Sequence, residues 1–254
     1  MDYVETRDKW FWDHYDNAAA ETIAFLREDG VDLAGKRIAD IGSGDGIIDL
    51  GIVRKAKPAQ LIGFDLNETN TDHLLRLSTS QGESSDLPAE LQFQQSHALA
   101  LPAEDSSFDV VLSWSAYEHI SNTDAISKEI FRVLKKDGTA FIQVWPLFYS
   151  EHGSHLDEYF AGFTHLTKRE DEIEALVLER AKDQDWAKNM LKEYAALNRK
   201  RLDEIHMSLR LSGLAVRRAE LLTHTVRLTP DLSMNYPLSD LLIAGFKLTA
   251  CRFE

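Results

Sequence analysis

The sequence predicts an α/β protein: a doubly wound, mostly parallel sheet of seven strands with an antiparallel edge strand and a helical cap insertion. From residue 36 to residue 145, short apolar runs alternate with longer segments of helical spacing, which is typical of parallel strands joined by helical crossovers. Two further strand-like runs, 216–226 and 241–252, are joined by about fourteen residues without a clear helix. This favours an antiparallel pair at one edge.

The elements of the first half follow in order from these patterns. Strands are predicted at residues 36–41, 60–65, 91–95, 108–113 and 139–145. Helices are predicted between them at residues 47–57, 68–80 and 125–136, where Pro58 and Asp137-Gly138 provide two of the stop signals. We therefore expect one domain with a lid at 1–35, a cofactor-binding core at 36–145 and C-terminal strands at 213–254.

The segment between the core and the last strands has a different composition. Residues 146–164 are rich in aromatic side chains and histidine, and 167–210 form a charged helical tract that we expect to break near 183–185. The charges of this tract nearly cancel, so it is either a solvated helix surface or part of a cap over the site. We expect residues 146–212 to form the cap and the substrate region.

Charge and cysteine content exclude several classes of function. The chain has 28 Lys and Arg against 42 Asp and Glu, a net charge of −14, which disfavours nucleic acid and anionic membrane surfaces as partners. A single cysteine, Cys251, closes no intrachain disulfide and supports no cysteine-based zinc site. The acidic start at residues 1–8 does not look like a secretory signal, and no apolar run approaches the length of a membrane span. We expect a cytoplasmic protein.

A glycine-rich turn follows the first predicted strand and opens the first helix. It has the pattern Asp40-x-Gly42-x-Gly44-x-Gly46, in which glycines let the backbone approach a ligand closely and the helix start offers free N–H groups. A dinucleotide fingerprint would need glycine where Ile47 stands. Asp65, at the end of the second strand, is placed to accept hydrogen bonds from ribose hydroxyls, or else to cap a helix.

A third block, Leu101-Pro102-Ala103-Glu104-Asp105-Ser106-Ser107-Phe108-Asp109-Val110-Val111, precedes and enters the fourth strand. With the glycine turn and Asp65, it makes the chain resemble the class I S-adenosylmethionine-dependent methyltransferases. The resemblance implies their Rossmann-like fold and S-adenosyl-L-methionine as cofactor. The residues that it assigns to cofactor binding are Asp40, Gly42, Ser43, Gly44, Gly46, Asp65, Leu66, His97, Ala98, Ser113 and Trp114.

The resemblance also implies which part of the cofactor each of these residues contacts. The glycine turn, with Asp40 behind it, would hold the methionine part, and Leu66 would pack on the adenine. His97 and Ala98 would lie at the adenine edge, although the family usually has an acid in place of His97. Ser113 and Trp114 would line the cofactor near its sulfonium.

Methyl transfer requires in-line geometry, and an oxygen nucleophile also needs a base. The candidate bases are His119 after the fourth strand and His152 and His155 after the fifth, each of which is otherwise a structural helix-start or loop residue. No metal site is expected, because His152, His155 and His165 lack matching acid spacing. Tyr15, in an aromatic N-terminal segment, either touches the cofactor or pins its helix to the domain.

The leading functional hypothesis is methyl transfer to a small-molecule acceptor. Residues 145–156 are loosely similar to methyltransferases of bacterial surface-sugar assembly, which favours a hydroxyl of a sugar or another polar metabolite. Two alternatives are a non-catalytic regulator that binds S-adenosylmethionine or S-adenosylhomocysteine, and a nicotinamide-dependent oxidoreductase, which Ile47 opposes. A homo-oligomer is compatible with the sequence, which specifies no oligomeric state.

Overall fold

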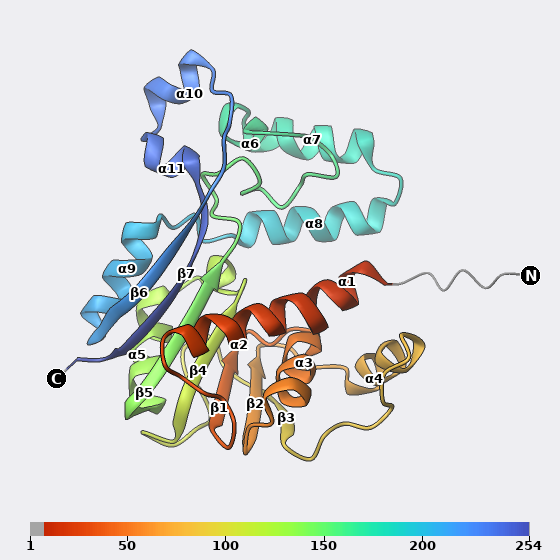
Figure 1. Cartoon of the computed structure of the whole chain (residues 1–254). Coiled ribbons are helices and arrows are strands. Elements are labelled where there is room, and N and C mark those ends of the chain that lie inside the picture. Colours follow the sequence, from red (N-terminus) through yellow and green to blue (C-terminus); the bar gives the residue numbers. More distant parts are fainter. Residues whose placement is uncertain (1–7, 254) are drawn as a thin grey trace, which may run out of the picture.

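The structure is a computed structural model that describes residues 8–253, so the expectation about the acidic start, and the first part of the expected lid, lie outside the described residues. Within this range the chain forms a seven-stranded sheet of order β3-β2-β1-β4-β5-β7-β6 (Figure 1). Its strands are β1 (Arg37–Ile41), β2 (Gln60–Asp65), β3 (Leu91–Gln95), β4 (Phe108–Trp114), β5 (Leu134–Val144), β6 (Leu214–Thr223) and β7 (Ile243–Arg252). The first five are parallel, and β7 is antiparallel to both β5 and β6. The predicted fold class is confirmed.

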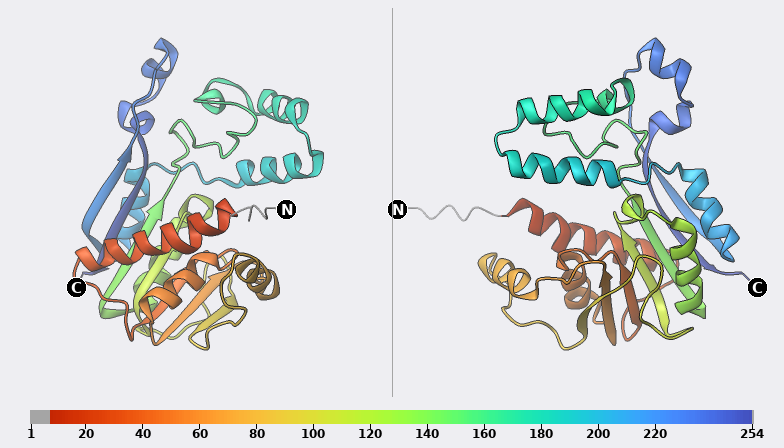
Figure 2. Two further views of the ribbon diagram at one scale, coloured as in Figure 1. Left: turned by 45° about the vertical axis from the view of Figure 1, so that its right-hand side comes forward. Right: turned by 180° about the vertical axis from the view of Figure 1, so that it is seen from behind.

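Helices cover both faces of this sheet and continue above it (Figures 1 and 2). The N-terminal half contains α1 (Lys9–Trp12), the π-helix η1 (Asp13–Ala18), α2 (Ala19–Glu28), α3 (Ile47–Ala56), α4 (Thr71–Ser80), the 3₁₀ helix η2 (Tyr117–His119) and α5 (Thr123–Val133). The C-terminal half contains α6 (Thr164–Thr167), α7 (Glu170–Arg180), α8 (Gln184–Ala196), α9 (Leu202–Leu211), α10 (Pro230–Asn235) and α11 (Leu238–Leu242). No helix among these described residues is long and apolar enough to cross a bilayer.

The central strands are apolar on both sides because each side packs against its own helical layer. Along β1, Ala39 and Ile41 belong to the core cluster that includes the buried side chains of α5 and α9. Ile38 belongs to the opposite cluster, with residues of α2 and α3. Since side chains alternate along a strand, Asp40 lies on the same side as Ile38. Its carboxyl group therefore lies beneath α2 and α3.

The boundary between α5 and β5 differs from the prediction. Helical spacing continues to residue 136, but α5 ends at Val133 and Leu134 already pairs with Phe108 of β4. Leu134 is fully buried in the core. Strand pairing and burial thus override the local helical pattern, with a register shift between Phe108 and Val110.

Residues 146–212, the expected cap and substrate region, form several separate helices. The expected break is confirmed, because the Asp183 side chain accepts from the backbone N–H groups of Asp185 and Trp186 and starts α8. A second break occurs at 197–201, where the Asn198 amide donates to the carbonyls of Tyr117 and Ile120. After this break, α9 packs against α5 beside the sheet, so it belongs to the sheet's helical layer.

Two short helices occupy the connection between β6 and β7, where no helix was expected. The α10 helix starts with a Thr229 side-chain cap and Pro230 in its first turn, a recognised helix start that the sequence already contains. Leu232 and Leu241 pack with Phe163 in a small apolar cluster. The connection thereby contributes to the upper part of the molecule (Figure 1).

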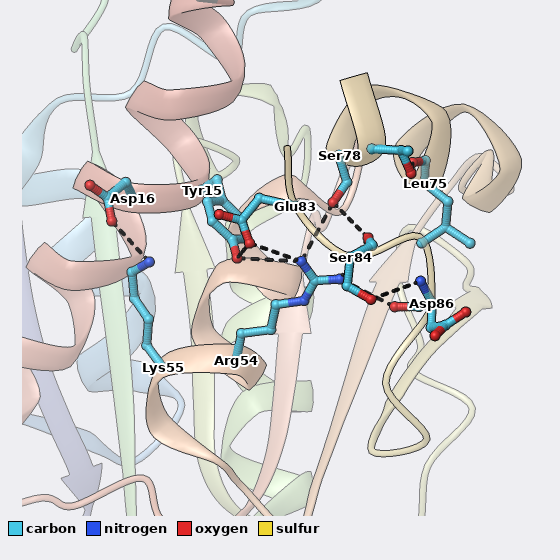
Figure 3. Close-up of polar contacts among 10 residues, drawn as sticks. Tyr15, Asp16, Arg54, Lys55, Leu75, Ser78, Glu83, Ser84 and Asp86 are labelled. Atoms are coloured by element: carbon cyan, nitrogen blue, oxygen red, sulfur yellow. Dashed lines mark hydrogen bonds and ion pairs between the residues drawn. The ribbon is translucent and has the colours of Figure 1, made fainter. Parts of the chain in front are cut away.

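The N-terminal helical segment is fixed to α3 by close packing. A Cβ atom at Gly51 would lie 2.2 Å from the backbone oxygen of Tyr15, so only glycine permits this approach. Figure 3 shows the polar network next to this contact: the Tyr15 hydroxyl donates to Glu83 over 2.7 Å, and Arg54 pairs with the same carboxylate at 3.3 Å. Arg54 also donates to the carbonyl of Ser84 at 3.0 Å. This network joins the N-terminal segment, α3 and the loop that follows α4.

Candidate functional site

A cavity of about 410 Å³ opens at the carboxyl ends of β1, β2 and β4. In the strand order the chain leaves β1 on one side toward β2 and returns on the other side at β4, and this change of direction is where doubly wound sheets bind ligands. The volume lies within the usual range for small-molecule pockets. Its wall is formed by Ile41, Gly42, Phe64, Asp65, Leu66, Asn67, Ser96, His97, Ala98, Leu101, Ser115, Ala116, His119, Ile120, Ser121, Ile126, Glu193 and Ala196.

The glycine turn has three left-handed positions, each with its own constraint. A Cβ atom at Gly42 would lie 2.4 Å from the Ala116 side chain, and one at Gly46 would lie 2.4 Å from the Phe93 ring. Gly42 and Gly46 are therefore required by packing within the protein. At Gly44, with φ +54°, nothing lies within 4 Å of a built Cβ atom, so the space beside Gly44 is open to a ligand.

Asp65 is tied directly to the glycine turn. Its Oδ2 accepts from the Gly44 N–H at 3.0 Å, and its Oδ1 accepts from the Asn67 N–H at 2.9 Å. Each carboxylate oxygen retains a further acceptor position. Asp65 can therefore accept from two hydroxyl groups of a ligand while it holds the turn in place.

Other predicted cofactor residues are distributed between the pocket and its surroundings. Leu66, His97 and Ala98 line the cavity, and the side chains of Leu66 and His97 are exposed. Ser43 does not line it, and its Oγ is buried without a hydrogen-bond partner among the described residues.

Ser113 and Trp114 are not in the pocket wall. The Ser113 hydroxyl donates to the Ile41 carbonyl at 3.0 Å, and Trp114 stacks on Phe141 with 6.2 Å between ring centroids. The wall near the end of β4 is instead formed by Ser115 and Ala116. β4 continues one residue beyond the predicted end, to Trp114, so the residues that line the cavity here belong to the turn that follows the strand.

Tyr15 is not brought to the pocket either. Its hydroxyl is engaged by Glu83 and Arg54, and its ring stacks on Phe11. These contacts attach the N-terminal helical segment to the rest of the domain, which is the second of the two interpretations of this aromatic segment. Trp10 instead reaches the glycine turn, since its Nε1–H donates to Asp45 Oδ2 at 2.9 Å.

Asp40 lies beneath the pocket in a buried carboxyl pair with Asp49 of α3. Asp40 is 4% exposed and Asp49 is fully buried. Apart from each other, Asp40 Oδ1 and both Asp49 oxygens have no hydrogen-bond partner among residues 8–253. Burial raises the pKa of Asp40 to about 6, and burial together with Asp40 raises the pKa of Asp49 well above its ordinary value. The two groups therefore share a proton in the neutral range.

The far wall of the pocket carries His119. His155 and Glu118, a residue that sequence reasoning missed, lie beside His119 and do not line the cavity themselves. The rings of His119 and His155 are 5.2 Å apart, and His119 Nδ1 lies 3.8 Å from Glu193 Oε2 of α8. Burial lowers the pKa of His119, and burial with the neighbouring His119 lowers that of His155 to about 4. Both imidazoles are neutral at pH 7. Glu118, beside them, is 5% exposed, and burial raises its pKa to about 8.

His152 occupies a different environment. Its Nδ1 pairs with Asp157 Oδ2 at 2.9 Å, and its ring contacts Trp145 and His224. It does not line the cavity. The structure therefore brings His119 and His155 together, and His152 is not part of this pair.

Comparisons with known proteins agree with this arrangement. A family model described as a methyltransferase domain matches residues 39–142, the range that holds the glycine turn, Asp65 and the segment before β4. This stretch, less than half of the chain, is similar to that methyltransferase family. The open space at Gly44 and the acceptor oxygens of Asp65 fit S-adenosyl-L-methionine, the cofactor that the sequence resemblance implies.

The individual proteins that resemble this chain share a third or less of their residues with it over the aligned parts. A demethylmenaquinone methyltransferase of Lactobacillus johnsonii is 27% identical over 62% of this chain and 70% of its own length. A ubiquinone biosynthesis O-methyltransferase of Psychrobacter cryohalolentis is 32% identical over 43% of this chain and 41% of its own length. A solved methyltransferase of Mesorhizobium loti has a TM-score of 0.56 at 16% identity, covering 94% of this chain and 100% of that one. The structural likeness shows the fold alone.

Proposed function

We propose that this protein transfers the methyl group of S-adenosyl-L-methionine to an oxygen atom of a small molecule, such as a hydroxyl of a sugar or of another polar metabolite. The observation that carries the proposal is one cavity with Gly42 and Asp65 on one side and His119 on the other. A cofactor held at the first side and an acceptor at the second can meet in line, which is the main requirement of the reaction.

The chain's own residues would share the binding task as follows. Asp65 accepts from the ribose hydroxyls, and the open backbone at Gly44 receives the methionine part. Leu66, His97 and Ala98 form the adenine end. Ser115 and Ala116 take the place near the sulfonium that was predicted for Ser113 and Trp114. When bound, the cofactor supplies an activated methyl group, so no covalent step is required of the protein.

An acceptor hydroxyl must lose its proton as the new bond forms. His119 lines the acceptor end and His155 lies beside it, and their lowered pKa values keep both as neutral imidazoles that can accept a proton. An oxygen acceptor is also supported by the O-methyltransferase among the relatives. The acidic chain as a whole, with a net charge of −14, favours a small molecule over nucleic acid.

The test is transfer of labelled methyl from S-adenosyl-L-methionine to a panel of sugars, phenols and other hydroxyl compounds. We expect one class to accept label with equal formation of S-adenosylhomocysteine, and His119→Gln to lower turnover by about 100-fold with little change in cofactor affinity. His206→Gln, an exposed histidine of α9, is the matched control. Cofactor binding without transfer to any acceptor would instead favour the non-catalytic regulator.

A further inference from the structure

Three groups that commonly bind metals meet beside the acceptor end of the pocket, which one of them, His119, lines. Glu118 and His119 lie in η2, directly after β4, and His155 lies in the loop that follows β5. One ligand atom from each of the three lies within 4.8 Å of the other two. Residues far apart in the chain are thus brought into one potential coordination sphere.

The polar atoms of this cluster lack other partners. Both carboxylate oxygens of Glu118, Nδ1 of His119 and Nε2 of His155 are buried without a hydrogen-bond partner in the described part of the chain. Glu118 is 5% exposed, so water does not compensate freely for the missing hydrogen bonds. Buried polar atoms are normally satisfied, and an unsatisfied group of this kind calls for a ligand or an ion.

The surroundings of His155 match those of a metal ligand. Its Nε2 atom is buried without a hydrogen-bond partner in the described part of the chain, and the backbone of Pro146 lies close enough to the ring to favour its protonated form. Metal-ligating histidines commonly donate a hydrogen bond from the second ring nitrogen, often to a backbone carbonyl, which fixes the tautomer and the ring orientation.

We propose that Glu118, His119 and His155 bind a divalent transition-metal ion of the zinc type and leave a coordination position open toward the pocket. Two imidazole nitrogens and one carboxylate favour zinc and its neighbours over magnesium, and three protein ligands with an open position are typical of catalytic zinc sites. His152 and His165, weighed with His155 from the sequence, are not part of this set. The acid that those histidines lacked is provided by Glu118, from another segment of the chain.

The local charges suit such an ion. Ionised Glu118 would compensate one of the two positive charges of a divalent ion. Glu193 lies next to the cluster, because its Oε2 is 3.8 Å from His119 Nδ1 and both residues line the pocket. The carboxylates of Glu118 and Glu193 together balance a doubly charged cation beside the cofactor site.

The inference rests on the proposed function and narrows its acceptor class. An acceptor hydroxyl that fills the open position would release its proton to solvent more readily, so enols, phenols and catechols fit better than ordinary alcohols. With the ion bound, the two imidazoles are ligands and solvent takes the acceptor proton. In the protein without the ion they remain the bases proposed above.

A second cluster, Glu151, His152 and His224, provides a control within the same chain. Its potential ligand atoms also lie within 4.8 Å of one another. However, His224 is exposed and His152 is already paired with Asp157. We therefore expect no comparable site there.

The experiment is titration of the chelator-treated full chain with Co²⁺, followed by the absorption of the bound ion and by Zn²⁺ competition. We expect one equivalent to bind, with affinity reduced at least about tenfold in Glu118→Gln and in His155→Ala and unchanged in His224→Ala. Thermal unfolding of each variant verifies that the fold is retained.

The proposal is overturned if the folded protein binds no Co²⁺, if binding survives both Glu118→Gln and His155→Ala, or if His224→Ala removes it. Affinity for S-adenosyl-L-methionine and methyl transfer before and after chelation are measured separately. Methyl transfer that is insensitive to chelation, in a protein without bound metal, would leave the proposed function intact and reject only the metal site.

Discussion

The buried Asp40–Asp49 pair makes a specific prediction about stability and pH. At neutral pH the native protein keeps this pair partly protonated, although both groups would be ionised in the unfolded chain. The pKa of Asp40 is higher in the folded protein than in the unfolded chain. Its contribution to the free energy of unfolding is therefore fully present below pH 3.8 and is lost as the pH rises through about 6. The pKa of Asp49 is also raised, well above its ordinary value, so Asp49 changes the stability with pH in the same direction.

The size of the effect follows from the pKa of Asp40. A rise from 3.8 to about 6 corresponds to roughly 3 kcal/mol at about 1.4 kcal/mol per pH unit. Asp49→Asn removes one acid and provides an amide that can donate to Asp40. The variant lacks the carboxyl of Asp49, whose folded-state pKa is raised well above its ordinary value. We therefore expect it to be more stable than the wild type at pH 8 and to show a smaller gain at pH 5.

Thermal unfolding from pH 5 to pH 8 measures this difference. Each kcal/mol corresponds to about 2–4 °C in Tm for a chain of this size, so the gain at pH 8 is readily resolved. Asp72→Asn is the matched control, because Asp72 is also an acid in the first turn of a ten-residue helix but is exposed. An Asp49→Asn variant that is equally destabilised at both pH values would refute the shared proton.

Three further predictions concern the pocket and the N-terminal segment. Asp65→Ala should weaken S-adenosyl-L-methionine binding about 100-fold in calorimetry, because two charge-assisted hydrogen bonds are lost; unchanged affinity would exclude the ribose role. Gly44→Ala should weaken cofactor binding, whereas Gly82→Ala, which also changes a glycine with positive φ and open space around it, should leave cofactor affinity unchanged. An equal loss of affinity in both variants would mean that backbone strain, and not contact with the cofactor, causes the loss. Tyr15→Phe should lower the free energy of unfolding by about 1 kcal/mol without changing cofactor affinity, because the hydroxyl loses its hydrogen bonds with Glu83 and Arg54. A large loss of cofactor affinity would instead place Tyr15 at the cofactor site.

Local patterns were sufficient to predict most of the sheet. The strand at Gln60–Asp65 and the strand at Leu91–Gln95 have the predicted bounds, because each is a short run between clear turn residues. The end of α5 was not predictable in this way. The burial of Leu134 and its pairing with Phe108 depend on β4, which helical spacing does not report.

The site was predictable where backbone motifs define it. The glycine turn and Asp65 are close in the fold because adjacent parallel strands end at the same edge of the sheet. Glu118 was missed as a functional candidate because its significance depends on burial and on His155, from a loop after another strand. The contacts of Tyr15 likewise depend on Arg54 and Glu83, which the aromatic pattern alone does not indicate.

The central claim is that the pocket beside Gly44 and Asp65 binds S-adenosyl-L-methionine. Calorimetric titration of the purified chain with S-adenosyl-L-methionine and S-adenosylhomocysteine, with NAD as a control, tests it most directly. The account predicts micromolar binding of both sulfur compounds, lost in Asp65→Ala, and no binding of NAD. Binding of NAD alone, or no binding of either sulfur compound by the folded protein, would contradict it.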